Sequence, residues 1–315
     1  MRNKVFLPLT VFAATVFAAL SLFGAARSAR ADTIITVCDE ANLNAALAAG
    51  GVITFDCNNV NDSATINFTA SKSVALPTKI DGGGRITLQG GNFNASMIYV
   101  DPGASLRMQG IALKGNTTTG LSGGAFYNNG SLELAQVDIT GMNVGGGFGG
   151  AIYSAGPLTL TRSALVFNYA GYGGAIRAGG GSVSLENSTI AFNYASAFAP
   201  AAGDGIYIDA GVPLTAVNAT IAYNGYNLSS ANIVVDGGAL TLRNTLLQNS
   251  GYANITRTTG SVTSLGYNLA DDSSGFLGAA GDINGADALL MSMVSGSPEQ
   301  AAYLPLDARS PAIDA

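Results

Sequence analysis

A repeat of roughly 22 to 30 residues constrains the fold of this chain more than any other feature. Each unit opens on small residues, usually two glycines, and continues with an apolar residue, a turn, an alternating apolar stretch and an asparagine. The clearest copies cover residues 123–143, 149–168 and 173–193. The first apolar residues of successive units are Ile98, Phe126, Ile152, Ile176, Ile206 and Ile233. Units of this length, built from strand and turn patterns without a helix, predict a β-solenoid.

The unit at residues 173–193 predicts how one coil is built. Strand patterns at residues 175–177, 182–186 and 189–192 are separated by turns at residues 179–181 and 187–188. Three short strands and three turns per coil describe a parallel β-helix, in which each strand pairs with its equivalent in the next coil about 4.8 Å away. The 42 glycines and the 48% hydrophobic residues suit such an all-β chain, which grows as one elongated domain.

The first 31 residues differ from the rest and predict an exported protein. Arg2 and Lys4 precede an apolar run, and residues 29–31 form a small-x-small cleavage motif, as in a secretory signal peptide. An uncleaved membrane anchor is the alternative, because the run is long. Removal of this segment takes away four of the 14 basic side chains and none of the 20 acidic ones, which leaves a net charge of −10. An acidic surface argues against nucleic acid as a partner, and against acidic polysaccharides unless a divalent cation bridges.

The two cysteines, Cys38 and Cys57, lie near the start of the mature chain. Export permits a disulfide between them, and two buried free thiols are the alternative. Between them, residues 39–47 predict a short helix that begins at Asp39 and ends before Gly50 and Gly51, followed by a strand at residues 52–55. We expect this segment to cap the open end of the solenoid. The predicted organisation is a signal peptide (1–31), an N-terminal cap (32–60), β-helix rungs (61–275) and a closing segment (276–315).

Asparagines recur at equivalent places and predict two ladders along the stack. One follows the third strand, with Asn168, Asn193 and Asn224, and the other precedes it, with Asn187, Asn218 and Asn244. Asparagine tolerates left-handed backbone, and its side chain can bond along a stack of turns. We interpret both columns as structural.

Catalytic chemistry has little support in the sequence. The chain contains no histidine, which excludes Ser-His-Asp and Cys-His machinery, and the assignment of both cysteines to the cap leaves no thiolate zinc site. Carboxylates remain as the candidate catalytic or metal-binding groups. Asp209 and Asp236 occupy the same turn of successive coils, with Arg257 nearby, and could hold a cation such as calcium and a base. The simpler interpretation is an Asp before a Gly in a tight turn. We therefore expect no metal, and calcium only as a minor alternative.

A column on the first strand of each coil is the candidate binding surface. Its members are Tyr99, Tyr127, Tyr153, Arg177, Tyr207 and Val234. Each follows a core-facing apolar residue, so strand alternation turns the column outward. Stacked phenol rings suit a linear sugar chain or a protein partner. An aromatic ladder that only stabilises the sheet is the alternative.

Two resemblances bear on the whole chain. The run at residues 167–176 resembles the repeat of chlamydial polymorphic outer-membrane proteins. Residues 37–57 resemble the N-terminal cap, and residues 287–315 the closing segment, of bacterial secreted right-handed β-helix proteins of the pectin-lyase-like superfamily, of the choice-of-anchor type. The resemblance covers residues 32–315 and implies a right-handed parallel β-helix. In that group more chain normally follows the closing motif, so an end at Ala315 suggests a fragment or a missing tail. The histidine-containing signature of the polygalacturonase branch is missing.

These observations favour an exported, non-catalytic β-helical surface protein for adhesion, cell-envelope contact or glycan binding. We expect a monomer at the cell surface or outside the cell, associated with the outer membrane in a Gram-negative bacterium. Its expected partner is a polysaccharide or a surface protein of a host or neighbouring cell. We expect no membrane span once the signal peptide is removed. The alternatives are a polysaccharide lyase or glycoside hydrolase of the same superfamily, and a purely structural spacer.

Overall fold

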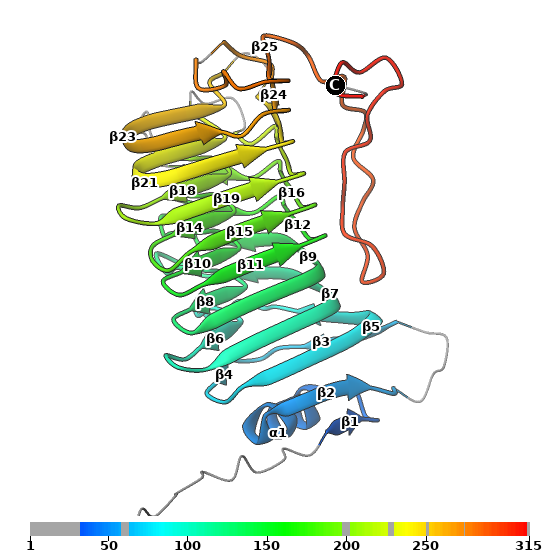
Figure 1. Cartoon of the computed structure of the whole chain (residues 1–315). Coiled ribbons are helices and arrows are strands. Elements are labelled where there is room, and N and C mark those ends of the chain that lie inside the picture. Colours follow the sequence, from blue (N-terminus) through cyan, green and yellow to red (C-terminus); the bar gives the residue numbers. More distant parts are fainter. Residues whose placement is uncertain are drawn as a thin grey trace, which may run out of the picture.

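The computed structural model is a parallel β-solenoid of about eight turns, with the N-terminal helix at one end of the stack (Figure 1). The structure describes residues 32–57, 63–196, 202–225, 230–249, 252–273 and 275–313. The proposed signal peptide lies outside the described residues. The expectation of an all-β parallel β-helix with a short capping helix is confirmed. Within the described ranges, no helix is long and apolar enough to cross a membrane.

Three columns of strands run along the stack, and every pairing between named strands is parallel. The first column contains β4 (Lys72–Val74), β6 (Ile98–Val100), β8 (Phe126–Asn128), β10 (Ile152–Ser154), β14 (Ile176–Ala178), β18 (Ile206–Ile208) and the beginnings of β21 (Ile233–Arg243) and β23 (Ile255–Ser264). Register is kept throughout this column, since Ile98 pairs with Phe126, and Ile152 with both Phe126 and Ile176.

The second and third columns are partly fused. Three strands, β5 (Thr78–Gln89), β7 (Ser105–Thr117) and β9 (Ser131–Asn143), run through both. The second column also contains β1 (Thr33–Ile35), β2 (Gly51–Phe55), β11 (Leu158–Thr161), β15 (Val183–Glu186), β19 (Pro213–Val217) and the ends of β21 and β23. The third contains β3 (Ala64–Asn67), β12 (Ala164–Val166), β16 (Thr189–Ala191), β20 (Thr220–Ala222), β22 (Leu246–Gln248), β24 (Leu269–Ala270) and β25 (Ile283–Asn284).

A fourth, two-residue strand departs from the expected three strands per coil. β13 (Tyr169–Ala170) pairs with β17 (Tyr194–Ala195) and, through Tyr169, with Asn143. Two residues are too short to show a strand period in the sequence. The strand forms because adjacent coils place equivalent backbone N–H and C=O groups opposite one another, where they can pair.

The core is filled by the residues that alternation turns inward. The apolar residues of the first column, from Ile98 to Ile233, are at most 1% exposed. Side chains of this size each stabilise the fold by about 1.5–3 kcal/mol when fully buried. The repeated apolar position of the sequence is therefore the inner wall of the first column.

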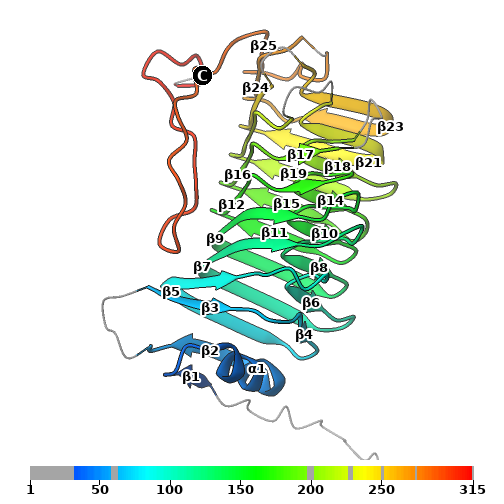
Figure 2. The ribbon, with the colours of Figure 1, turned by 180° about the vertical axis from the view of Figure 1, so that it is seen from behind.

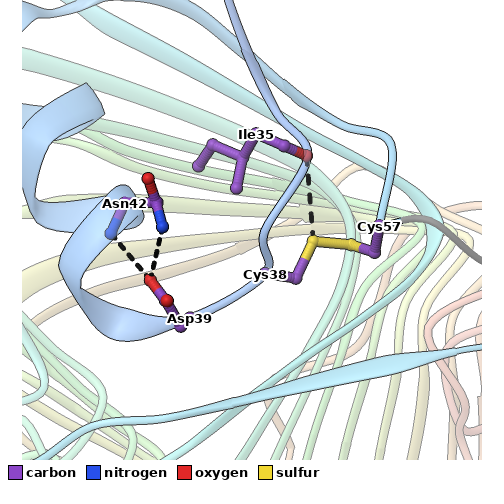
Figure 3. Close-up of a disulfide and its surroundings, with 5 residues drawn as sticks. All are labelled: Ile35, Cys38, Asp39, Asn42 and Cys57. Carbon is purple, nitrogen blue, oxygen red and sulfur yellow. Dashed lines mark hydrogen bonds between the residues drawn. A yellow bond between two sulfur atoms is a disulfide. The ribbon is translucent and has the colours of Figure 1, made fainter.

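The N-terminal cap agrees with its prediction. Helix α1 (Glu40–Ala49) begins after Asp39, whose carboxylate accepts the Asn42 N–H at 2.8 Å, and ends at Gly50, whose φ is 66°. Cys38 and Cys57 form a disulfide with their Cα atoms 5.5 Å apart, so the expected pairing is confirmed (Figure 3). The cross-link closes a loop of about 19 residues that contains the helix, which by the chain-entropy account contributes about 3 kcal/mol.

The C-terminal segment runs back along the outside of the solenoid. Residues 286–313, which we call the strap, turn away from the last coil and descend beside the third column (Figures 1 and 2). Its two arms pair antiparallel at Leu290 with Leu306 and at Val294 with Tyr303. Ala302 and Leu304 pack on small apolar residues of the third column, namely Ala164, Val166, Ala191 and Ala222. The segment expected to close the solenoid thus covers one of its faces.

Candidate functional site

Three tyrosines form an outward column on the first strands. Tyr99, Tyr127 and Tyr153 are the central residues of β6, β8 and β10 and are directly paired in register. Their ring centroids are 5.5 and 4.8 Å apart, and each side chain is half-buried while its strand neighbours fill the core. The ring spacing follows from the stacking of the coils, because equivalent residues of adjacent parallel strands lie about 4.8 Å apart.

The local environment holds these rings in place. The Tyr153 ring lies against the turn of the next coil, where a Cβ added to Gly179 would be 2.8 Å from the Tyr153 hydroxyl. Glycine, which has no Cβ, leaves space at position 179 for the Tyr153 ring. Burial, and the neighbouring phenols of Tyr153 and Tyr99, raise the pKa of Tyr127. The Tyr127 hydroxyl therefore stays protonated at neutral pH and can both donate and accept a hydrogen bond.

Arg177 continues the column but is already engaged. Its guanidinium makes a bidentate ion pair with Asp209, with Nε–Oδ2 and Nη2–Oδ1 distances of 2.9 and 3.0 Å. Its face lies 4.0 Å from the Phe148 ring centroid and 5.1 Å from that of Tyr207. A planar cation that is fixed on one edge and stacked on rings is rigid, and it offers a positive end to the tyrosine column.

Tyr207 is nearly covered, which strand alternation alone did not predict. The residue is 9% exposed and packs edge-on against Tyr172. Its hydroxyl donates to Asp236 at 2.6 Å. Burial and this hydrogen bond raise the pKa of Tyr207, while hydrogen bonds from Thr258 and Tyr207 lower that of Asp236. The accessible part of the predicted column therefore runs from Tyr99 to Arg177.

The two aspartates proposed as a cation site each have protein partners. Asp209 binds Arg177 through both carboxylate oxygens, and Asp236 accepts hydrogen bonds from Tyr207 and Thr258. Arg257 stacks on Phe276 at 5.5 Å from the ring centroid. Across the part of the chain that the structure describes, no group of three or more His, Cys, Asp or Glu side chains is placed to hold a metal ion.

Two further carboxyls have raised pKa values, but both are buried. Burial raises the pKa of Asp138, which is 2% exposed beneath the strap, and raises that of Asp204, at 0% exposed, to about 6. Glycoside hydrolysis needs two carboxyls that face a bond of the substrate from opposite sides. Neither residue can meet a polymer at the surface.

The two predicted asparagine ladders differ in position. Asn168, Asn193 and Asn224 are buried and joined by amide hydrogen bonds of 2.9 Å, and the series continues through Asn232 and Asn254. The spacing along the chain changes at Asn232, so the sequence repeat did not reveal these last two members. The members of the other column, Asn187, Asn218 and Asn244, are exposed, and Asn244 donates to Asn218 at 2.7 Å.

Comparison with known proteins gives the chain no relative. No protein-family model matches it, no curated protein matches it, and no solved structure matches it. The resemblances to pectin-lyase-like and polymorphic outer-membrane proteins therefore rest on the sequence motifs alone.

Proposed function

We propose that this is an exported, non-catalytic β-helical protein that binds a linear glycan along the column formed by Tyr99, Tyr127, Tyr153 and Arg177. One observation carries the proposal. Three outward, half-buried phenol rings follow one another at 5.5 and 4.8 Å and end at a fixed guanidinium. Aromatic faces pack on the apolar faces of sugar rings, while the hydroxyls meet sugar hydroxyls.

The spacing favours a sugar chain over an extended peptide. Coils repeat about every 4.8 Å along the stack, whereas an extended peptide advances only about 3.3 Å per residue. Successive tyrosines would therefore contact different parts of successive residues in a peptide. They would contact equivalent positions of a sugar chain whose repeating unit is roughly as long as the 4.8 Å spacing between coils. The acidic composition favours a neutral chain, since an acidic one would need a bridging cation such as calcium.

Location and attachment are part of the same proposal. The leader-like first 31 residues and the disulfide fit export, where such cross-links persist. A rigid solenoid monomer at the cell surface would present the column to polysaccharide of the envelope or of a neighbouring cell. The motif resemblance to secreted pectin-lyase-like proteins supports this setting.

The test is a binding and depolymerisation screen of residues 32–315 against soluble polysaccharides and whole cells, with and without calcium. We expect saturable binding without product release. Tyr127→Ser combined with Tyr153→Ser should weaken it at least tenfold, since stacking on each ring is lost. Tyr169→Ser combined with Tyr194→Ser is the matched control, because it removes another stacked pair, 5.3 Å apart, from the fourth strands.

Two outcomes would overturn the proposal. Equal loss of binding in both double variants would show that the tyrosine column is not the site. Release of shortened products would instead favour the polysaccharide lyase or hydrolase alternative, and Asp236→Ala would then test the carboxylates beside Arg177.

A further inference from the structure

A second longitudinal feature lies at the turn between the second and third columns of strands. In six successive coils this turn contains one exposed residue with a positive φ, between 47° and 60°. These residues are Gln136, Arg162, Asn187, Asn218, Asn244 and Tyr267. Left-handed backbone at the same point of each coil directs the six side chains along one line, which we call the turn column. Its members are polar or aromatic, and they do not take part in the buried ladder.

The strap forms a wall beside the turn column. It is anchored by the Ala302 N–H, which donates to Asp138 at 3.2 Å, and by the Ala288 N–H, which donates to Gln248 at 3.0 Å. Gly296 lies so close to Asp138 that an added Cβ would be 2.3 Å from the carboxylate. The strap is therefore held at a fixed distance from the solenoid at both ends.

Two cavities lie between the turn column and the strap. One, of about 250 Å³, is lined by Gln136, Arg162 and Asn187 on the solenoid side and by residues 299–303 of the strap. The other, of about 230 Å³, is lined by Asn218, Asn244 and Tyr267 on the solenoid side and by Leu306 and Ala312 of the strap. Because the solenoid walls come from consecutive coils, the cavities lie in line along the stack.

We propose that the strap and the turn column together form a groove that binds a neutral oligosaccharide lengthwise. Each cavity is smaller than the sites that hold compact ligands of drug size, which suits a chain that occupies several small subsites in turn. The second cavity has no charged side chain in its lining, and the first has only Arg162 and Glu299. An anionic sugar chain would therefore contact a single basic side chain, that of Arg162, along the two cavity linings.

The chemistry of the lining matches hydroxyl groups. Side-chain amides donate and accept hydrogen bonds, as sugar hydroxyls do. Most coils of the turn column contribute one amide side chain to the groove. Tyr267, 51% exposed, and Tyr303, 39% exposed, place an aromatic ring beside each cavity. This groove is separate from the tyrosine column of the first strands, so the inference does not rest on the proposed function.

The left-handed backbone permits a clean test. Glycine adopts positive φ without strain, so a triple variant with Asn187→Gly, Asn218→Gly and Asn244→Gly removes three amides and preserves the turns. Cellohexaose and xylohexaose are the neutral probes, measured by calorimetry, and oligogalacturonate is the anionic comparison. We expect the wild type to bind a neutral probe, the triple variant to bind it at least tenfold more weakly, and Tyr169→Ser with Tyr194→Ser, on the fourth strands, to bind it as the wild type does.

A second variant guards against a folding defect in the triple variant. Thr220→Tyr, on strand β20, introduces a residue with high β-propensity that fills the second cavity, and it should weaken binding to a similar extent. Full binding in both variants would overturn the inference, as would the lack of any neutral-probe binding by the wild type. Loss of neutral-probe binding in Tyr127→Ser with Tyr153→Ser, together with full binding in both groove variants, would support the proposed function and overturn the groove.

Discussion

Asparagine has two different roles in this protein, and the direction of its side chain decides which. In the buried ladder, the Asn193 amide donates to Asn224 and to the carbonyls of Leu165 and Ala191. Its carbonyl oxygen accepts from both the backbone and the side chain of Asn168. In the turn column, the amides of Asn187, Asn218 and Asn244 face solvent. The residue type and the repeat are visible in the sequence, but the direction depends on whether backbone at that turn is left-handed.

Asn193→Ala should therefore be among the most destabilising single substitutions in the turns. It leaves the buried Asn168 N–H without its partner, which costs about 1–3 kcal/mol. It also removes one of the two hydrogen bonds of the Asn168 amide and one of the two that the Asn224 carbonyl oxygen accepts. We expect the free energy of unfolding to fall by about 3 kcal/mol in urea titrations. Asn244→Ala, in the exposed column, is the control and should cost less than about 1 kcal/mol. Similar losses in the two variants would mean that the buried and exposed asparagine columns contribute equally to stability.

At the scale of elements, the half-buried carboxylate of Glu40 joins the cap helix to the first complete coil. Glu40 pairs with Lys72 of β4 and accepts hydrogen bonds from the backbone and hydroxyl of Thr69 at 2.8 and 2.7 Å. Burial alone would raise the pKa of Glu40, but the hydrogen bonds from Lys72 and Thr69 outweigh it and lower the pKa to about 2. The helix is thus fixed by contacts with residues about 30 positions further along the chain.

This contact predicts a pH dependence. The pKa of Glu40 is lower in the folded than in the unfolded protein, so its contribution is complete above about pH 4.5 and is lost as the pH falls toward 2. We expect Glu40→Gln to lower stability by about 2 kcal/mol at pH 7, allowing for solvent screening, and to remove that part of the acid sensitivity. Thermal unfolding across pH 2–7 measures both. Glu133→Gln, which disturbs the exposed pair with Arg107, should change little.

At the scale of the whole molecule, the strap decides which faces of the solenoid are open. It covers the alanine-rich outer face of the third column and buries Asp138, while the first column keeps its outward tyrosines. The sequence motif at the C-terminus predicted a closing segment for the end of the stack. Its docking along the side depends on a match in shape between Ala302, Leu304 and small residues from several coils, which no local pattern encodes.

Strap docking should weaken as Asp138 ionises. Burial raises its pKa in spite of the Ala302 hydrogen bond and the nearby Lys114, so the folded state favours the protonated form. The stabilisation from Asp138 is complete below its pKa in the unfolded chain, about 3.8. It declines as the pH rises toward the higher pKa of Asp138 in the folded protein. Asp138→Asn keeps an acceptor for Ala302 without the charge. We expect it to increase hydrogen-exchange protection of the strap several-fold at pH 7.5.

The exposed Asp56 provides the control for that experiment. Asp56→Asn makes the same charge change in the N-terminal cap and should leave protection of the strap unaltered. Reduced protection in Asp138→Asn would mean that the negative charge itself holds the strap, and it would reverse the sign of the prediction.

The amino-acid sequence is enough to predict the stack, the core column, the capping helix and the outward direction of Tyr99, Tyr127 and Tyr153. The helix follows from its Asp39 start and Gly50 stop, and the other three features follow from a short repeat or from strand alternation. All of these signals act between residues that are neighbours in the chain or one coil apart. The packing of separate segments is needed to see that Tyr207 is covered, that Arg177 is paired with Asp209, and that the strap encloses two cavities beside the turn column. The Arg177–Asp209 and Tyr207–Asp236 contacts recur from one coil to the next, but whether a column side chain is covered depends on how side chains from separate segments fill the same space. The strap contacts join residues that no repeat relates.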